Sequence, residues 1–302
     1  MILEAGHLNK WYGRVTALSD VSLRLEPGIT GLLGPNGAGK TSLLRIAIGL
    51  MKPSSGTIRV LGQSPWNNPR LAVRLGYGPE HDGFYEWMTG REFVTALARL
   101  RAVRNPGKAA AAALDRVRLA EVADRRISTY SRGMRQRLKI AQALAHGPEL
   151  LFLDEPLTGC DPLVRTELIA LIRGFAAAGG SAVVSSHVLH EIEALTRRIV
   201  LIHRGRLVAE GEIGEIRDLI DRHPHTVRVA TDRARELAAA LAAEPEVVEI
   251  LFEEGALRVR TPRPDAFYRR LPAIALERGC GIREISSPDD NLEAVFRYLT
   301  ER

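Results

Sequence analysis

Residues 34–42, with the sequence Gly-Pro-Asn-Gly-Ala-Gly-Lys-Thr-Ser, constrain this chain most, because they match the phosphate-binding pattern G-x-x-x-x-G-K-[ST]. The apolar run 29–33 before them predicts a buried strand, and residues 42–48 after them predict a helix. A strand, a loop and a helix in this order form the context that the pattern requires. A chance glycine-rich turn would need neither the Lys-Thr pair nor these flanking elements.

The residue types of this loop suit a nucleoside triphosphate with Mg²⁺. Glycines at 34, 37 and 39 adopt backbone angles closed to other residues and let amides approach phosphate oxygens. The helix that follows directs the positive end of its dipole at the same anion. Lys40 is expected to contact the β- and γ-phosphates, and the Thr41 hydroxyl to bind Mg²⁺. The loop alone does not say what the energy is used for.

Length and composition indicate a folded protein of about two domains. The chain has 302 residues, of which 45% are hydrophobic and 26% charged, as in soluble globular proteins. No apolar run approaches the ~18 residues needed to cross a bilayer. Residues 1–7 lack the features of a secretion signal, so a cytoplasmic location is expected. Two cysteines are too few for a disulfide framework or a metal cluster.

The net charge of +6 and the pI of about 9.6 would suit a nucleic acid or an anionic membrane surface. The chain has no run of five or six like charges and no interleaving of aromatic and basic residues. An arginine-rich composition is therefore the favoured explanation, and no nucleic-acid partner is expected.

A second motif lies at the end of the apolar run 150–153, which predicts a buried strand followed by Asp154 and Glu155. This is the Walker B arrangement: Asp154 would hold Mg²⁺, and Glu155 would act as general base on the attacking water. The run 181–186 predicts another buried strand that ends at His187. A single histidine is usually structural, but one beside the γ-phosphate pocket could hydrogen-bond that phosphate.

Three further positions could contact the nucleotide, and each also has an ordinary structural explanation. Residues 2–33 are expected to form antiparallel strands, and Tyr12 among them could stack on a purine or be an ordinary aromatic. Helix-forming residues dominate 89–146. Within them, Ser131 and Gly133 are expected at a helix N-terminus, a second anion-binding end. A serine there is more commonly only a helix cap.

The order of these motifs resembles the nucleotide-binding subunit of an ATP-binding cassette (ABC) transporter. The resemblance covers about residues 2–220. Its most specific feature is the LSGGQ-type stretch at 130–134, which lies between the Walker A loop at 34–42 and Walker B; only this class of ATPase has that order. It implies an α/β fold: a P-loop cassette with a mixed sheet core, an antiparallel β subdomain and a helical insert at about 86–146. The first domain would span 1–220 and a C-terminal accessory or regulatory domain 221–302.

The resemblance also implies a role for each matching residue. Tyr12 would stack on adenine, and Ser131 and Gly133 would contact the γ-phosphate bound to the opposite subunit. Asp161 would link the two subunits, and His187 would sense the γ-phosphate. The phosphates would be held by Gly34, Asn36, Gly37, Ala38, Gly39, Lys40, Thr41 and Ser42.

One chain with one Walker A loop and one signature stretch holds only half of each site. The resemblance therefore implies a head-to-tail homodimer, or a paired cassette, that closes around two ATP. It also implies a separate transmembrane permease, contacted by the segment 78–85 and the helical insert. The subunit would lie on the inner face of the cell membrane.

Three departures from the family pattern point to one branch. Glu80 replaces the usual glutamine before the helical insert; its carboxylate could bind Mg²⁺ or water but adds negative charge. In the signature stretch 130–134, Arg132 and Met134 replace Gly and Gln of the LSGGQ pattern. Cys160 lies in the loop 158–162, expected at the subunit interface, where a Leu or Ala is more familiar. These variants resemble the branch that serves type-2, exporter-like permeases.

The C-terminal residues predict the order β-α-β-β-α-β, a ferredoxin-like arrangement, followed by a helix at about 292–299. We expect this region to stabilise a dimer or to regulate the protein.

Two alternatives to an exporter subunit remain: a soluble ABC ATPase acting on nucleic acid or ribosomes, which the basic pI favours, and an importer ATPase. Against the first, the chain has neither two cassettes nor a long coiled-coil insert.

Overall fold

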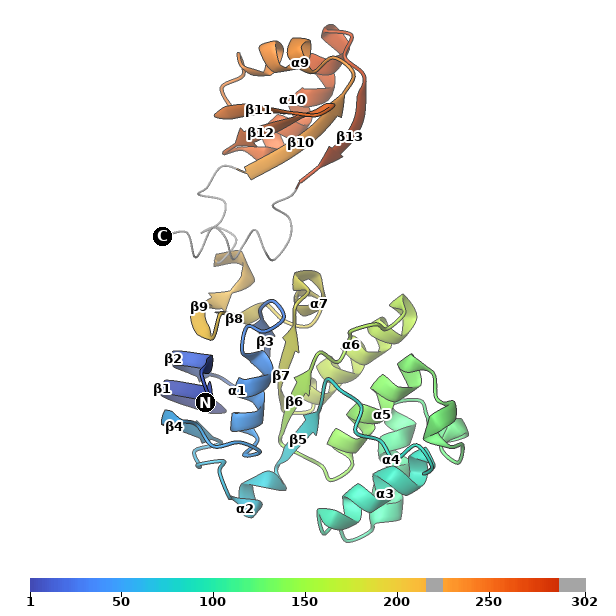
Figure 1. Ribbon diagram of the computed structural model, residues 1–302. Coiled ribbons are helices and arrows are strands. Elements are labelled where there is room, and N and C mark those ends of the chain that lie inside the picture. Colours follow the sequence, from blue (N-terminus) through green and yellow to red (C-terminus); the bar gives the residue numbers. More distant parts are fainter. Residues whose placement is uncertain (216–224, 288–302) are drawn as a thin grey trace. The chain divides into compact units, whose positions relative to one another are not determined.

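The computed structural model describes residues 1–215 and 225–287 (Figure 1). The chain divides into two compact units, Met1–Ile213 and a second unit that begins at Gly214. Each unit is described by itself. The boundary suggested by the sequence, between residues 220 and 221, lies outside the described residues, as does the helix expected at 292–299.

A six-stranded mixed sheet forms the centre of the first unit. Its strand order is β5-β6-β7-β3-β8-β9, and every neighbouring pair is parallel except β8 and β9. The strands are β3 (Ile29–Leu33), β5 (Leu75–Gly78), β6 (Leu150–Asp154), β7 (Ser181–Ser186), β8 (Arg198–His203) and β9 (Arg206–Glu212). The expectation that residues 2–33 are all antiparallel is wrong for β3, which pairs in parallel with β7 and β8 because its apolar residues are buried on both faces.

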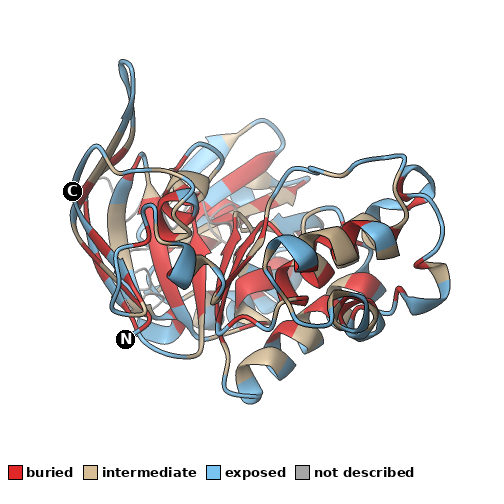
Figure 2. Ribbon diagram, turned by 90° about the horizontal axis from the view of Figure 1, so that it is seen from below, coloured by how far each residue is buried: buried red, intermediate tan, exposed pale blue. Residues whose placement is uncertain are grey.

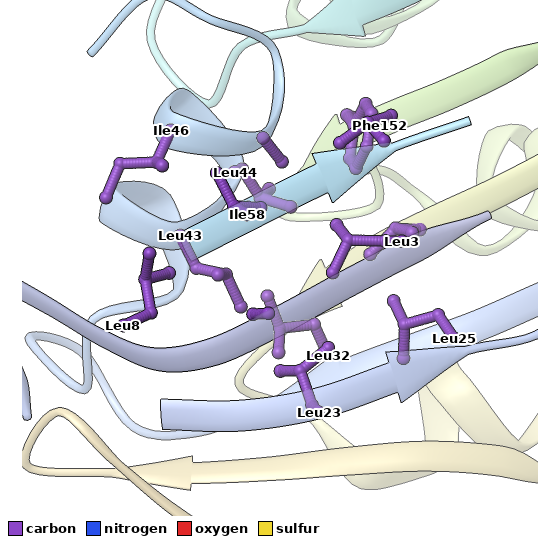
Figure 3. Packing of buried hydrophobic residues seen from close by; sticks show 14 of the residues in the cluster. Leu3, Leu8, Leu23, Leu25, Leu32, Leu43, Leu44, Ile46, Ile58 and Phe152 are labelled. Carbon is purple, nitrogen blue, oxygen red and sulfur yellow. The ribbon is translucent and has the colours of Figure 1, made fainter. Parts of the chain in front are cut away.

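An antiparallel sheet, in the order β2-β1-β4, packs over the mixed sheet across helix α1 (Lys40–Ala47). Its strands are β1 (Leu3–Tyr12), β2 (Val15–Leu25) and β4 (Ser55–Val60). Leu3 and Leu23 from this sheet meet Leu44 of α1 and Leu32 and Phe152 of the mixed sheet in one buried cluster (Figure 3). This core fixes where β3 ends and α1 begins.

Three helices of this unit, α3, α4 and α5, form a helical layer beside β5 (Figure 1). Thr89 and Glu92 form a reciprocal capping box that starts α3. Buried residues follow the strands and one side of the helices (Figure 2). The helices are α2 (Pro69–Ala72), α3 (Gly90–Leu100), α4 (Pro106–Arg116), α5 (Arg132–Leu144), α6 (Pro162–Ala177) and α7 (Leu189–Glu193), with short 3-10 turns at Ala120–Val122 and Ile127–Thr129.

The second unit has the predicted ferredoxin-like order. Its antiparallel sheet runs β11-β12-β10-β13, and two helices cover the face that carries Val227, Val229, Leu257 and Val259. On the opposite face Glu253 pairs with Arg228 and Arg258. The elements are β10 (His225–Thr231), α9 (Ala234–Leu241), β11 (Glu249–Glu253), β12 (Ala256–Thr261), α10 (Pro264–Glu277) and β13 (Ile282–Ser286). The predicted fold class is confirmed for both units.

Candidate nucleotide-binding and catalytic site

The glycine-rich loop joins the carboxyl end of β3 to the first turn of α1. Gly39 lies just before α1 with φ +107°, and a Cβ atom there would lie 2.4 Å from the Ala17 carbonyl oxygen, so only glycine fits. Gly37 has φ +78°, and a Cβ atom there would meet no atom within 4 Å. The loop therefore opens on the side of Gly37. A short anion-binding concavity of backbone amides needs such an open side.

Lys40 is folded back into the loop. Its Nζ atom donates to the carbonyl oxygens of Gly34, at 2.6 Å, and Pro35, at 3.3 Å. It also lies 3.2 Å from Glu155 Oε1, with only 6% of the lysine side chain and 4% of the glutamate exposed. The ammonium group thus joins the loop to the end of β6. A buried ion pair of this kind persists only where both charges are well partnered.

The other loop residues differ in exposure. Ala38 is buried and donates its amide to the Pro35 carbonyl, whereas Asn36 is exposed. Thr41 and Ser42 are half-buried in the first turn of α1. The loop residues predicted from the sequence are therefore contiguous around the N-terminus of one helix.

Asp154 and Glu155 lie side by side at the end of β6, both buried. The Ser185 hydroxyl donates to Asp154 Oδ1 at 2.6 Å and accepts from the Glu155 amide at 2.9 Å. Glu155 has φ +48°, an unusual angle for a residue with a side chain, and this hydrogen bond helps to hold it. Glu155 Oε2 accepts from Thr158 Oγ1 at 2.9 Å and lies 2.9 Å from His187 Nδ1.

Asp154 Oδ2 has no hydrogen-bond donor among the described residues, whereas Glu155 Oε1 faces the Lys40 ammonium at 3.2 Å. Buried carboxylate oxygens normally find a donor or a cation. Oxygen ligands are those that Mg²⁺ prefers. The Asp154 oxygen therefore fits a hard divalent cation, and Thr41, in the first turn of α1, stays a predicted second ligand.

Tyr12 and Ser42 come together although 30 residues separate them. The tyrosine hydroxyl lies 3.4 Å from Ser42 Oγ and donates to Met51 Sδ at 2.7 Å. Its ring is 44% exposed at the end of β1, and the Lys10 ammonium lies 5.3 Å from the ring centroid. An exposed ring tethered at the start of α1 suits stacking on a base.

The signature residues occupy the N-terminus of α5, as expected. Ser131 Oγ accepts from the Met134 amide at 3.3 Å, which makes it a helix cap in this state. No hydrogen bond joins Ser131 or Gly133 to the glycine-rich loop within residues 1–215. The guanidinium group of Arg132 lies against Gly159, where a Cβ atom would clash with it. The signature turn therefore packs on the loop 158–161 of its own chain.

Asp161 and Glu80 lie at two other edges of the site. Asp161 Oδ1 accepts from the Val164 amide at 2.9 Å and caps α6. Glu80 follows β5; its carbonyl oxygen accepts from Lys139 Nζ, and its carboxylate lies 3.7 Å from His81 Nδ1. A cavity of about 370 Å³ is lined by Glu80 together with Glu155 and Thr158. No hydrogen bond joins Glu80 to Asp154 in the part of the chain that the structure describes.

Ser185 and Thr158 are contacts that the sequence analysis did not assign. Ser185 lies opposite Asp154 in the pairing of β7 with β6, so its role depends on strand register. The Ser-Ser pair at the end of an apolar strand was a usable signal. Thr158 lies three residues after Glu155, at the spacing of a side chain that bonds back across a turn.

Known sequences place the chain in a family. Residues 18–158 match the sequence model described as ABC transporter. The chain is 34% identical to the uncharacterized ABC transporter ATP-binding protein YxlF of Bacillus subtilis (strain 168), over 98% of each chain. It is 32% identical to the daunorubicin/doxorubicin resistance ATP-binding protein DrrA of Streptomyces peucetius, over 99% of this chain and 92% of the other. It is 33% identical to the bacitracin transport ATP-binding protein BcrA of Enterococcus faecalis, over 99% of this chain and 96% of the other.

Solved structures of ATP-binding cassettes have the same fold as the first unit. The ATP-binding subunit of an ABC transporter matches with a TM-score of 0.66 at 28% identity, over 72% of this chain and 92% of that one. A dimeric ATP-binding cassette in a post-hydrolysis state, bound to ADP and Pi, matches with a TM-score of 0.65 over 70% and 99%. At 21% identity, this second likeness concerns the fold alone.

The chain belongs to the ATP-binding subunits of ABC transporters. It is an ATPase of the cassette type, and this family couples ATP hydrolysis to transport. Within residues 1–215 and 225–287, none of the helices combines the length and the apolar character that a membrane span requires.

Proposed function

We propose that this subunit binds ATP with Mg²⁺ between two copies of itself and drives a separate membrane permease that exports its substrate. The observation that carries the proposal is the buried pair of Lys40 and Glu155, which joins the phosphate loop to the strand end that bears both carboxylates. A triphosphate entering the loop offers the lysine a stronger set of anionic partners. Glu155 is then released to act on water.

The chain's own residues divide the work of hydrolysis. Lys40 and the amides of the loop hold the phosphates, and Tyr12 stacks on the base. Glu155 takes the proton of the attacking water, and His187, 2.9 Å from Glu155 Oε2, holds that carboxylate and contacts the γ-phosphate. Thr41, Asp154 and Glu80 would hold Mg²⁺, which neutralises charge on the β- and γ-phosphates when bound.

Closure of the dimer completes each site in this proposal. Ser131 and Gly133 lie at the N-terminus of α5, where backbone amides and the helix dipole favour an anion. They share no hydrogen bond with their own chain's phosphate loop in the described residues, which suits a role toward the ATP of a second copy. Asp161 begins α6 beside them and would meet the partner across a two-fold axis.

Glu80→Gln tests whether the carboxylate has a separate role at the metal. We expect ATP hydrolysis to stay within about an order of magnitude of the wild type, because an amide oxygen can also bind a hard cation or water. Phosphate release by the full-length protein, measured over a range of Mg²⁺ concentrations, gives the answer. Complete loss of hydrolysis would show that the negative charge is required.

A groove between the helical layer and the mixed sheet is the proposed docking site of the permease. It encloses about 510 Å³ and is largely apolar. Burial, with Arg101 nearby, lowers the pKa of His146, so this imidazole stays neutral at physiological pH. Its apolar lining includes Ile48, Leu50, Pro65, Ala72, Leu75, Tyr77, Leu97 and Ala98, and its polar lining is Asn67, Asn68, Arg101, Gln142 and His146.

The segment 80–86, which follows β5, is joined to the signature helix α5 by charged contacts. Asp82 Oδ1 lies 2.8 Å from Lys139 Nζ, and Glu86 makes two hydrogen bonds of 2.7 Å with Arg135. Burial opposes the charged form of Asp82, but Lys139 and Arg135 outweigh it and lower the pKa of this carboxyl. A partner that moves the segment 80–86 would thus move α5 and Ser131 with it.

Leu50→Glu tests the docking site. Leu50 is 65% exposed in the groove, so a charge there should leave the fold intact but place an unpaired carboxylate in an apolar contact. We expect loss of co-purification with a co-expressed permease that the wild-type subunit retains, with ATP binding unchanged. Leu276→Glu, at a position 83% exposed in the second unit, is the matched control. Equal recovery of the permease with both variants would contradict the assignment.

The names of DrrA and BcrA, drug resistance and bacitracin transport, support export as the direction. The subunit would then lie on the inner face of the cell membrane, held there by the permease. Binding to RNA at physiological salt, or co-purification with a substrate-binding protein, would instead favour a ribosomal or an import role.

A further inference from the structure

Glu191 is a buried carboxylate that the mechanism above does not use. It lies on α7, four residues after His187, and only 4% of it is exposed. Its Oε2 atom accepts from the Ser186 hydroxyl at 2.9 Å, and its Oε1 atom lies 3.4 Å from Arg165 Nε. A carboxylate this deep is costly unless it is paired, so the fold retains Arg165 and Glu191 together.

Arg165 reaches from Glu191 to the interface loop, defined here as residues 158–161. It lies in the first turns of α6, and its amide donates to the Asp161 carbonyl. Its Nη2 atom donates to the carbonyl oxygen of Cys160 at 3.5 Å. One guanidinium group therefore contacts the loop that is proposed to meet the partner subunit and, at its other edge, the helix that follows His187.

Ser186 carries this contact to His187. Its hydroxyl donates to Glu191 and accepts from the Val188 amide at 3.0 Å, so it ties together the backbone on both sides of the histidine. His187 Nδ1 in turn lies 2.9 Å from Glu155 Oε2. A series of contacts thus runs from Cys160 through Arg165, Glu191 and Ser186 to the proposed general base, and its weakest member is the 3.4 Å ion pair of Arg165 with Glu191.

The contact between Arg165 and Glu191 is incomplete in this state. The 3.4 Å separation is an ion pair, but Arg165 Nε, although buried, has no partner with hydrogen-bond geometry among the described residues. Buried donors of this kind usually have a partner in the functional state. A small shift of the interface loop would be enough to shorten the contact.

We propose that Arg165 and Glu191 are positioning residues that couple the interface loop to His187. The inference rests on the proposed roles of Glu155 and His187. When a second copy meets the interface loop, Arg165 closes on Glu191, and Glu191 sets the backbone that aims His187 at Glu155. Neither residue touches ATP, so their effect is on the rate of hydrolysis and not on nucleotide affinity.

The test is a double-mutant cycle in the full-length protein with Arg165→Met, Glu191→Gln and the combination. We expect each single variant to lower kcat by about 10- to 100-fold, as misplacement of catalytic groups does, with KM for ATP within about threefold of the wild type. The double variant should be no slower than the worse single variant, because both changes break one coupling. Arg165→Lys should give an intermediate kcat, because a lysine can reach either Glu191 or the Cys160 carbonyl but not both.

Thermal stability separates this role from a structural one. In a merely structural ion pair, removing both charges should restore stability and activity together, since no buried charge is left unpaired. Here kcat of the double variant should stay low even where its melting temperature recovers. The exposed Arg197→Met is the control and should match the wild type.

Three results would overturn the proposal: kcat within twofold of the wild type in both single variants, losses that multiply in the double variant, or kcat that recovers with the melting temperature. Glu155→Gln, assayed in parallel, distinguishes a failure of the proposed function from a failure of the coupling between Arg165 and Glu191. If that variant still hydrolyses ATP, the proposed function itself fails. If it is inactive while the Arg165 and Glu191 variants are not, only the coupling is wrong.

Discussion

Glu155→Gln should keep ATP binding, lower the rate of hydrolysis by about 10²- to 10⁴-fold and hold the protein as an ATP-bound dimer. The amide retains the shape of the side chain and can still accept from Thr158 Oγ1, so the loop after β6 should not move. It cannot take a proton from water. The γ-phosphate therefore stays in place, and with it the contact that closes the dimer. Phosphate release and size-exclusion chromatography with and without ATP and Mg²⁺ report the two effects separately.

Glu121→Gln is the matched control, because Glu121 is exposed on a 3-10 turn of the helical layer. It should behave as the wild type in both assays. A Glu155→Gln protein that remains monomeric with ATP would rule out the two-copy site. One that dimerises and hydrolyses at the wild-type rate would assign the proton transfer to another group.

Lys40→Ala should abolish ATP binding and hydrolysis. In the proposed site the lysine supplies charge-assisted hydrogen bonds to two phosphates, and loss of about 3 kcal/mol or more corresponds to a rise in Kd of roughly 100-fold or greater. Binding of a fluorescent ATP analogue to the full-length protein measures this directly. Lys108→Ala, at an exposed position of α4, should bind ATP normally. Undiminished hydrolysis by Lys40→Ala would show that the loop has been misassigned.

The ion pair with Glu155 gives the Lys40 variant a second effect. Removing the ammonium leaves the glutamate buried without its cation, so the ATP-free protein should also melt at a lower temperature. Combining Lys40→Ala with Glu155→Gln removes that carboxylate charge. The double variant should recover stability but not ATP binding, which separates the role in folding from the role in the site.

Local sequence patterns were sufficient for the glycine-rich loop and for the strand that ends in Asp154 and Glu155. Both depend on short apolar runs and on residue types that have few other uses. The order of elements in the C-terminal unit was predictable for the same reason: alternating short strands and helices separated by turns. Ser131 was expected at a helix N-terminus, and the structure shows it capping α5.

Contacts that depend on strand register and on side-chain rotamers could not be predicted in this way. Ser185 meets Asp154 only because β7 lies beside β6 in that register. Lys40 bonds the carbonyl of Gly34 and faces Glu155, 115 positions along the chain, which no local pattern contains. The roles of Tyr12, Glu80, Asp161 and His187 toward a nucleotide, a metal or a second copy stay predictions.

The central place of β3 has a consequence for how the protein is made. Both of its neighbours in the sheet, β7 and β8, come from residues 181–203, about 150 positions after the loop that β3 supports. Contacts so distant in sequence form late, because their loop-closure entropy must be overcome first. A nascent chain that has not yet reached residue 181 has neither neighbour of β3. The nucleotide loop therefore leaves the ribosome well before the two strands that anchor it.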